Sequence, residues 1–322
     1  MRMTTRTVLA LVALAAAAPL AAQEFPARAV RVIVPQPPGG GFDTVARIVA
    51  EPFAKFLGQP VIVENRPGAG TIVGTEAAAK SDPDGYTLLL GASANLALNP
   101  GLFKKLPYDP KNDFALVGLA AGISYTLVAR NDLPLGSLKE ILEHARRNPG
   151  KLTYASGGNG TGQHIAAAVM FHLAKVSVLH VPYKGAQAAY QDLIPGRVDL
   201  FFDASSTAKG HIDNGRVKPI AVSFGERLAI HPEVPTVREA GVPEFEMETW
   251  VGYFARAGAP APVLERLRAD FERTVALPEI TAALEKRGLR PIRLPVREAE
   301  ALVAKDIDRW TSLIRSAGLS AD

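Results

Sequence analysis

The chain contains no cysteine among its 322 residues. This absence excludes disulfide bonds, zinc thiolates, iron–sulfur ligands and a cysteine nucleophile. No run of lysine or arginine accompanies the formal net charge of +4, so we do not expect a nucleic-acid surface. Beyond the N-terminal region, no apolar run is long enough to form a membrane helix. The 48% apolar and 21% charged residues are typical of a globular protein, which argues against disorder or a coiled coil.

Residues 1–22 have the pattern of a secretory signal peptide. Arg2 and Arg6 precede the apolar run Val8–Ala18, which is too short for a membrane anchor, and Pro19 ends that run. Small residues follow, and we predict cleavage after Ala22. Cleavage would leave a formal charge of +2 and, without a cysteine to carry a lipid, a soluble protein of the bacterial periplasm. The alternative is that this run is a buried core helix.

The length favours two domains, and the order of elements predicts two successive α/β units followed by helices. Glycine and proline loops separate the elements, and strands alternate with helices in a way that is typical of parallel sheets. We expect the final helices to pack on the first unit. The predicted strands are Val30–Pro35, Pro60–Glu64, Tyr86–Leu90, Ala115–Ala121, Tyr125–Ala129, Leu152–Ala155, Val176–Val181, Val198–Phe202, Val217–Val222 and Trp250–Ala255. The predicted helices are one that starts at Asp43, then Ile72–Lys80, Leu138–Arg147, Gln163–Leu173, Ala186–Leu193, Ser205–Ile212, Pro262–Val275 and Arg297–Ser316.

This order predicts a discontinuous first lobe, residues 23–122 with 224–322, and a second lobe, residues 123–223. The two crossings would lie near Gly122 and Phe224. A ligand would then bind between the lobes, at the carboxyl ends of strands and the N-termini of helices. Within the first helix, we expect Asp43 to be the N-cap and Pro52 to kink or split the helix.

Two loops have the same pattern of strand, glycines and helix: Pro35–Asp43 and Ser156–His164. Glycines allow the backbone to approach a ligand closely, and the free N–H groups and dipole of a helix N-terminus favour an anion. Together the loops predict an anion site without arginine. The alternative is a pair of ordinary strand-to-helix turns, which also favour glycine.

Nucleotide, metal and catalytic motifs are absent or incomplete. Gly158 and Gly160 are followed by Gln163 where a dinucleotide motif has its third glycine, and no Walker, H-E-x-x-H or G-x-S-x-G motif occurs. We therefore expect no catalytic residue, metal or cofactor. We interpret His164 as a residue that hydrogen-bonds to its loop rather than as a metal ligand. Two alternatives stay open: Asp203 caps the following helix or faces the cleft, and Lys184 is a cleft cation or a solvated loop residue.

A series of short motifs spans nearly the whole mature chain, from Phe25 to about Ser316. In this order and spacing, the sequence resembles the Bug-type solute receptors of tripartite tricarboxylate transporters. The chain departs from these receptors at Thr71, where another glycine is frequent, and at Ala255–Pro260. The motifs are Pro38-Gly39-Gly40 with Asp43 and Arg47, Val63–Gly70, Asp82–Leu89, Leu106–Asp109, Ser156–His164, Val181–Gly185, Val198–Asp203, Pro235–Gly241 and Trp250.

The resemblance implies an α/β fold of the type II periplasmic binding protein class, a Venus flytrap with a cleft between two lobes. It implies a monomeric periplasmic receptor that captures a small carboxylate and delivers it to integral membrane subunits of such a transporter. A periplasmic enzyme acting on a carboxylate or ester, and a receptor that feeds a sensor, are the alternatives. The ligand-binding residues that we expect lie on the two glycine loops and on two further cleft loops: Pro38, Gly39, Gly40, Asp43, Ser93, Asn95, Ser156, Gly158, Gly160, Thr161, His164 and Asp203.

Overall fold

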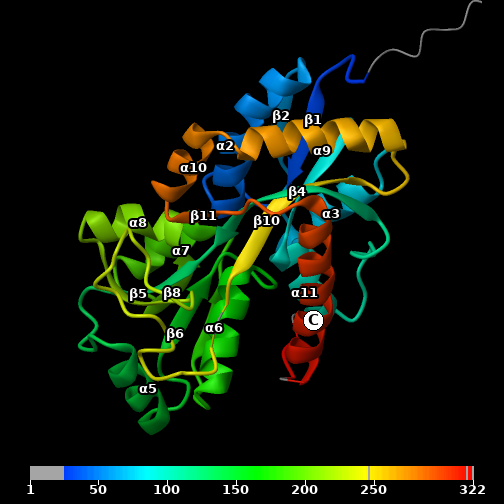
Figure 1. The fold of residues 1–322 in the computed structure, drawn as a ribbon. Coiled ribbons are helices and arrows are strands. Elements are labelled where there is room, and N and C mark those ends of the chain that lie inside the picture. The colour runs from blue at the N-terminus through cyan, green and yellow to red at the C-terminus, as the bar shows by residue number, and fades with distance from the viewer. Residues whose placement is uncertain (1–24, 246, 317, 321–322) are drawn as a thin grey trace, which may run out of the picture.

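Two separate β-sheets organise the molecule (Figure 1). The structure is a computed structural model that describes residues 25–245, 247–316 and 318–320. The first sheet has the strand order β11-β4-β10-β3-β1-β2, and the second has the order β7-β6-β8-β5-β9. The strands of the first sheet are β1 (Val30–Val34), β2 (Val61–Asn65), β3 (Thr87–Ala92), β4 (Phe114–Ile123), β10 (Thr249–Arg256) and β11 (Leu289–Pro291). Those of the second are β5 (Tyr125–Arg130), β6 (Thr153–Ser156), β7 (Leu179–Pro182), β8 (Leu200–Ala204) and β9 (Val217–Val222).

Helices cover both sheets because the central strands are apolar on both faces and must be buried on both sides. Each sheet contains three parallel strands, β1 with β2 and β3 in the first and β6 with β7 and β8 in the second. Strands β10 and β5 run antiparallel to their neighbours. The helices are α2 (Gly41–Leu57), α3 (Ile72–Ala79), α4 (Asn99–Leu102), α5 (Leu138–Arg147), α6 (Gly162–Leu173), α7 (Ala186–Leu193), α8 (Ser205–Asp213), α9 (Ala261–Val275), α10 (Pro278–Glu285) and α11 (Val296–Ser316), with short turns η1 (Ala69–Thr71) and η2 (Ser93–Leu98).

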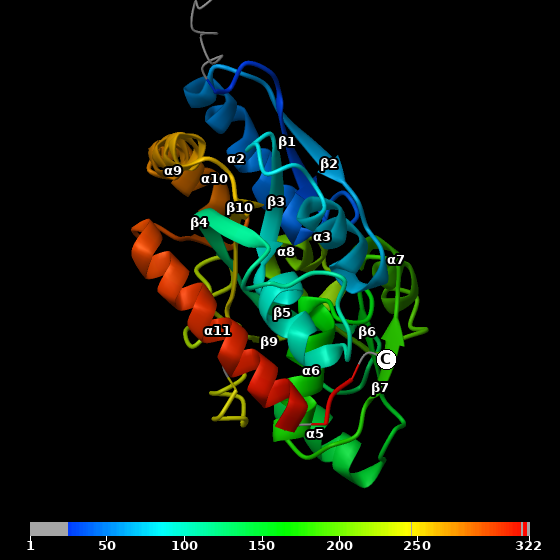
Figure 2. The same ribbon diagram turned by 90° about the vertical axis from the view of Figure 1, so that its right-hand side faces the viewer.

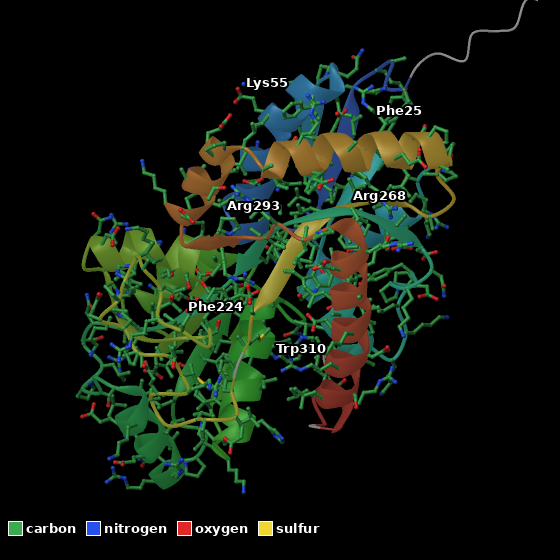
Figure 3. The ribbon with its side chains drawn as sticks, in the orientation of Figure 1. Phe25, Lys55, Phe224, Arg268, Arg293 and Trp310 are labelled. Atoms are coloured by element: carbon green, nitrogen blue, oxygen red, sulfur yellow. The ribbon has the colours of Figure 1, made fainter. Side chains whose placement is uncertain are left out.

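The chain crosses between the sheets at two places. It leaves the first sheet after Ile123 and enters the second at Tyr125, and it leaves the second after Val222 and returns at Thr249. Phe224 packs in a small cluster with Val222 and lies beside the second sheet (Figure 3). The segment after β9 therefore stays with the second sheet before the chain returns.

Helices α9 and α11 pack on the first sheet, as the sequence predicts. Helix α9 contacts α2 and β4, and α11 contacts η2 and α4, lying along the outside of the molecule (Figure 2). Trp310 on α11 is buried, and Trp250 on β10 donates from Nε1 to Asp306 at 3.0 Å. The contacts of α11 with η2 and α4 join the end of the chain to elements about 200 residues earlier.

Two expectations about α2 are wrong. The helix begins after Gly40, so Asp43 lies in its first turn and is not the N-cap. The helix also continues through Pro52 to Leu57 without a break. Burial of the apolar face of α2 against the sheet compensates the hydrogen bond that proline cannot donate. Gly58 ends the helix in the left-handed conformation.

The predicted α/β class with two sheets is confirmed. The short elements η2, α4, α10 and β11 were not predicted, because segments of three to eight residues carry too little periodicity to be recognised. The predicted signal peptide, residues 1–22, lies outside the described residues. Within the described ranges, none of the helices combines the length and the apolar character that crossing a bilayer requires.

Candidate functional site

A cavity of about 500 Å³ lies between the two sheets, a volume within the usual range for a small-molecule site. Each sheet contributes two loops to its wall. In the first sheet these loops follow β1 and β2, and in the second they follow β6 and β7. The lining residues are Pro35 to Gly40, Pro67 to Thr71, Gly157, Gly158, Thr161, Gln163 and Tyr183 to Gln187.

The sheet topology explains why the cavity lies here. In the first sheet β1 sits between β3 and β2, and in the second β6 sits between β8 and β7. From β1 the chain passes to β2 on one side, and β3 then lies on the other side of β1; β6, β7 and β8 follow the same path. This change of direction opens a crevice at the carboxyl end of β1 and of β6. The two glycine loops follow these two strands, and the crevices face each other across the cavity.

The first glycine loop is fixed by a buried carboxylate. Gly39 has a φ of +82°, which turns the chain into α2. Its N–H group donates to Asp43 Oδ2 at 3.0 Å. Asp43 also accepts from Asn65 Nδ2 at 3.0 Å and from Arg47 Nε at 3.0 Å. The same Asn65 amide donates to the carbonyl of Gln36 at 3.0 Å, so strand β2 and helix α2 hold both ends of the loop.

Asp43 is therefore bound on both of its oxygens by the protein itself. Burial acts to raise the pKa of Asp43, but the hydrogen bonds from Arg47, Gly39 and Asn65 outweigh burial and lower that pKa. The side chain stays ionised at neutral pH and lies behind the cavity wall, not in it. Its position supports the loop.

The second glycine loop is fixed by neutral groups. Ser156 Oγ and His180 Nε2 lie 2.6 Å apart, and the Gly158 N–H group donates to Ser156 Oγ at 3.1 Å. The Gly160 N–H group donates to His164 Nδ1 at 3.3 Å, as predicted for a histidine that hydrogen-bonds to its loop. The rings of His164 and His180 stack with centroids 4.1 Å apart, and His180 stacks on Tyr154 at 4.8 Å.

The Ser156–His180 pair does not form a nucleophile with a base. Ser156 is fully buried, and burial together with the neighbouring His164 lowers the pKa of His180 to about 3. Burial also lowers the pKa of His164 to about 4, so both rings are neutral at pH 7. In the described part of the chain, no carboxylate hydrogen-bonds to His180, and no cluster of three metal-ligating side chains occurs.

Three helix N-termini at the cavity wall favour an anion without an arginine in the described lining. These are the N-termini of α2, α6 and α7, and each carries about half a unit of positive charge. Lys184 is the one charged side chain among the described lining residues. Lys184 is also exposed, so both interpretations of this residue stay open. This arrangement can neutralise carboxylate groups and donate hydrogen bonds to them.

Five of the predicted site residues line the cavity: Pro38, Gly39, Gly40, Gly158 and Thr161. The other seven lie behind its wall, and their contact with a ligand stays a prediction. Ser93 Oγ accepts from the Trp250 N–H group at 3.0 Å. Asn95 accepts from Ala92 and donates to Thr75 Oγ1, so its amide holds the start of η2. Asp43, Ser156, Gly160, His164 and Asp203 support the two glycine loops or lie beneath them.

Asp203 lies under the second loop. Its Oδ1 accepts from Gln163 Nε2 at 2.5 Å and from the Ala204 N–H group at 2.8 Å. Helix α8 has Ala204 as N-cap and no side-chain cap, so the capping interpretation of Asp203 is wrong. Burial raises the pKa of Asp203 to about 7, against the lowering effect of the hydrogen bonds from Gln163 and the Ala204 N–H group.

Two lining segments were not predicted as ligand loops, Pro67 to Thr71 and Tyr183 to Gln187. Both follow the second strand of a parallel pair, and both contain glycines with positive φ, at Gly68, Gly70 and Gly185. A Cβ on Gly70 would overlap the carbonyl oxygen of Asn159, so the two sheets' loops touch at this edge of the cavity. The strand-glycine-helix pattern could have identified both segments if it had been searched after every strand.

Comparison with known proteins places this architecture in a family. Residues 45–319 match the family described as tripartite tricarboxylate transporter family receptor. The chain is 38% identical over 299 residues to the UPF0065 protein in the tcbD-tcbE intergenic region of Pseudomonas sp. strain P51, covering 92% of this chain and 89% of that protein. It is 32% identical to Protein BugT of Bordetella pertussis, covering 94% and 93% of the two chains.

Solved structures agree with this comparison. The periplasmic binding protein BugD is 33% identical and superposes with a TM-score of 0.86 over 92% of this chain and 99% of its own. MatC from Rhodopseudomonas palustris, solved with malate, is 34% identical with a TM-score of 0.85 over 90% and 100%. A protein of R. palustris solved with adipate is 28% identical with a TM-score of 0.87 over 92% and 100%. The chain therefore belongs to the receptor family of the tripartite tricarboxylate transporters.

Proposed function

We propose that this protein is a periplasmic receptor that binds a small carboxylate in the cavity and delivers it to the integral membrane subunits of a tripartite tricarboxylate transporter. The observation that carries this proposal is the convergence of three helix N-termini and Lys184 on one cavity. Membership of the receptor family supports it, as do the relatives solved with malate and adipate. The receptor acts as a monomer, without a cofactor.

Binding, and not catalysis, is the proposed role. The solved relative BugD is a periplasmic binding protein, which supports this role. The buried Ser156 and the low pKa of His180 argue against nucleophilic attack on a carboxylate ester. Delivery to a sensor instead of a transporter is not favoured by any feature of the cavity.

The ligand-bound form is proposed to be closed. We propose that two lobes follow the two sheets, as the sequence predicted, with crossings at residues 123–125 and 223–248. Lobe closure brings the loops after β1 and β6 onto the same ligand, since only a closed cavity offers both sets of donors. The contact between Gly70 and Asn159 marks the edge where the lobes meet.

A thermal-shift screen of the purified mature chain tests this function. We expect mono-, di- or tricarboxylates to raise the melting temperature by several degrees at about 100 times their dissociation constant, where binding adds about 2.7 kcal/mol. Methyl esters of the same acids should have no effect, because esterification removes the charge. A response to sugars or polyamines without any response to carboxylates would refute the proposal.

A further inference from the structure

A buried amide, Asn99, lies at the edge where the loops of the two sheets meet. This residue begins α4 and is fully buried. We propose that Asn99 is a positioning residue for ligand binding. It holds the turn Ala69–Thr71 against Asn159 and Gly160 of the second glycine loop, and this contact keeps the cavity closed around a bound molecule. The inference rests on the proposed closure of two lobes and is the same for every class of carboxylate.

The turn Ala69–Thr71 has a conformation that its sequence does not favour. Three successive residues have a positive φ: +44° at Ala69, +61° at Gly70 and +81° at Thr71. Left-handed backbone costs free energy for alanine, and more for a β-branched threonine. All three residues line the cavity. Strain of this kind persists only where the surrounding structure imposes it, and it is concentrated at functional sites.

Asn99 supplies the hydrogen bonds that hold this turn. Its Nδ2 group donates to the carbonyl of Gly70 at 3.1 Å, to the Thr71 hydroxyl at 3.1 Å and to the Tyr108 hydroxyl at 3.2 Å. A carbonyl can only accept, so Gly70 fixes the orientation of the amide. The Tyr108 hydroxyl in turn donates to the carbonyl of Asn95 at 2.6 Å. The side chain of Asn99 therefore ties the turn to α4 and η2.

The carbonyl oxygen of the same side chain faces the second glycine loop. Asn99 Oδ1 has no hydrogen-bond partner within the described ranges, and a Cβ on Gly160 would lie 3.0 Å from it. A Cβ on Gly70 would overlap the carbonyl oxygen of Asn159. The two backbones can approach this closely only because Gly70 has no side chain. A buried oxygen without a donor destabilises the fold, so its retention here fits a role in this contact.

Spin-label distance measurements test whether the contact closes the cavity. The chain contains no cysteine, so Ile62→Cys on β2 and Leu179→Cys on β7 provide two unique label sites. Both residues are exposed, and their strands are edges of the two sheets on the same side of the molecule (Figure 2). The labelled chain is measured alone and with a mixture of malate, adipate, citrate and benzoate.

We expect a short-distance population in the labelled parent chain, largest with the acids. Gly70→Ala places a methyl group against Asn159 and should reduce that population at least about fivefold. The matched control is Gly58→Ala, which has a similar φ of +73° but no atom within 4 Å of its Cβ, and should keep the parent distribution.

Three results would overturn the inference: a parent distribution in Gly70→Ala, an equal shift in Gly58→Ala, or a parent chain without a short-distance population. Carboxylate binding itself is decided by the thermal-shift screen, and none of these three results refutes it.

Replacement of Asn99 separates positioning from stability. Asn99→Ala should shift the distances in the same direction as Gly70→Ala, and should weaken binding of those of the four acids that bind the parent by about tenfold. Calorimetry well below the melting temperature measures the affinity. The control is Asn131→Ala, which removes an exposed amide that also donates to a glycine carbonyl, that of Gly215. A lower melting temperature with parent distances and parent affinity would show a merely structural role, and Gly70→Ala decides the question if Asn99→Ala does not fold.

Discussion

The two glycine loops occupy equivalent places in their sheets but are held by different chemistry. The loop after β1 is bound to a buried carboxylate, Asp43, which is paired with Arg47 and with the Asn65 amide. The loop after β6 is bound to neutral groups, namely Ser156 and the stacked rings of His164 and His180. In both arrangements the supporting side chains accept hydrogen bonds from N–H groups of their own loop, from Gly39 in the first loop and from Gly158 and Gly160 in the second.

A loop of glycines between a strand and a helix can therefore be held either by a charged carboxylate or by neutral side chains. A charged support is strong because charge-assisted hydrogen bonds are stronger than neutral ones. A neutral support avoids placing a negative charge beside an anionic ligand. The two loops should therefore respond differently to substitution and to pH, and the following experiments measure that difference.

The largest effect is expected from loss of the charged support. Asp43→Ala leaves the Gly39 N–H group without its acceptor and removes the carboxylate from Arg47 and Asn65, and should lower the free energy of unfolding by about 2–4 kcal/mol. Urea denaturation measures this change. Asp43→Asn keeps one acceptor oxygen and should lose less. If both variants were as stable as the parent chain, the charged support would be ruled out.

Loss of the neutral support should cost less. His180→Ala removes the stacked ring and the partner of Ser156, and we expect a loss of about 1–3 kcal/mol in the same urea assay. The matched control is His172→Ala, which removes an exposed histidine from α6 and should change stability by about 0.5 kcal/mol or less. Identical stabilities of the two variants would show that the stack does not support the loop.

Acid should weaken the neutral support before the charged one. The unfolded chain protonates His164 and His180 near pH 6.5, but the folded chain protonates them only near pH 4 and 3. The unfolded state therefore binds more protons in this window, and stability falls as the pH decreases from 6.5 towards 4. Asp43, whose folded pKa is lowered, contributes stability that is lost only as the pH falls below 3.8.

Protonation of Asp203 changes stability in the opposite direction to protonation of the two histidines over part of this pH range. Its pKa is raised to about 7 in the folded chain, so the folded state binds the extra proton between pH 3.8 and 7. Stability from this group falls as the pH rises. Asp203→Asn should therefore make the acid loss steeper, and His180→Ala should make it shallower. Urea midpoints between pH 7 and 4.5 check both signs, and parallel profiles for all three chains would contradict this assignment.

The smallest effect on stability is expected at the glycines of the first loop. Gly39→Ala forces a side chain into a φ of +82° and should cost about 1 kcal/mol. Gly40 has a φ of −85°, and a Cβ there would lie 3.5 Å from Gln36 Oε1, so Gly40→Ala should cost about 0.5 kcal/mol or less. Thermal unfolding ranks the two. The reverse order would mean that the loop conformation differs from the one described.

Much of the fold could be predicted from local patterns. Helices α5 and α7 and strand β9 have the predicted bounds, since their capping residues and apolar spacing are strong signals. Strand β7 begins at Leu179, three residues after the predicted start, because its edge position leaves its side chains half exposed. The candidate site was predicted where glycines follow a strand, at Gly39, Gly40 and Gly158.

The sequence by itself determined the α/β class, the family and the two glycine loops, because these depend on periodicity, on glycine positions and on short motifs in a fixed order. Only the tertiary structure decided which polar side chains face the cavity and which lie behind it. Asp43, Asn95 and His164 are predicted ligand groups, and in the structure each accepts a hydrogen bond from a backbone N–H group near it. A buried polar group must find a partner, and which partner it finds depends on elements distant in the chain.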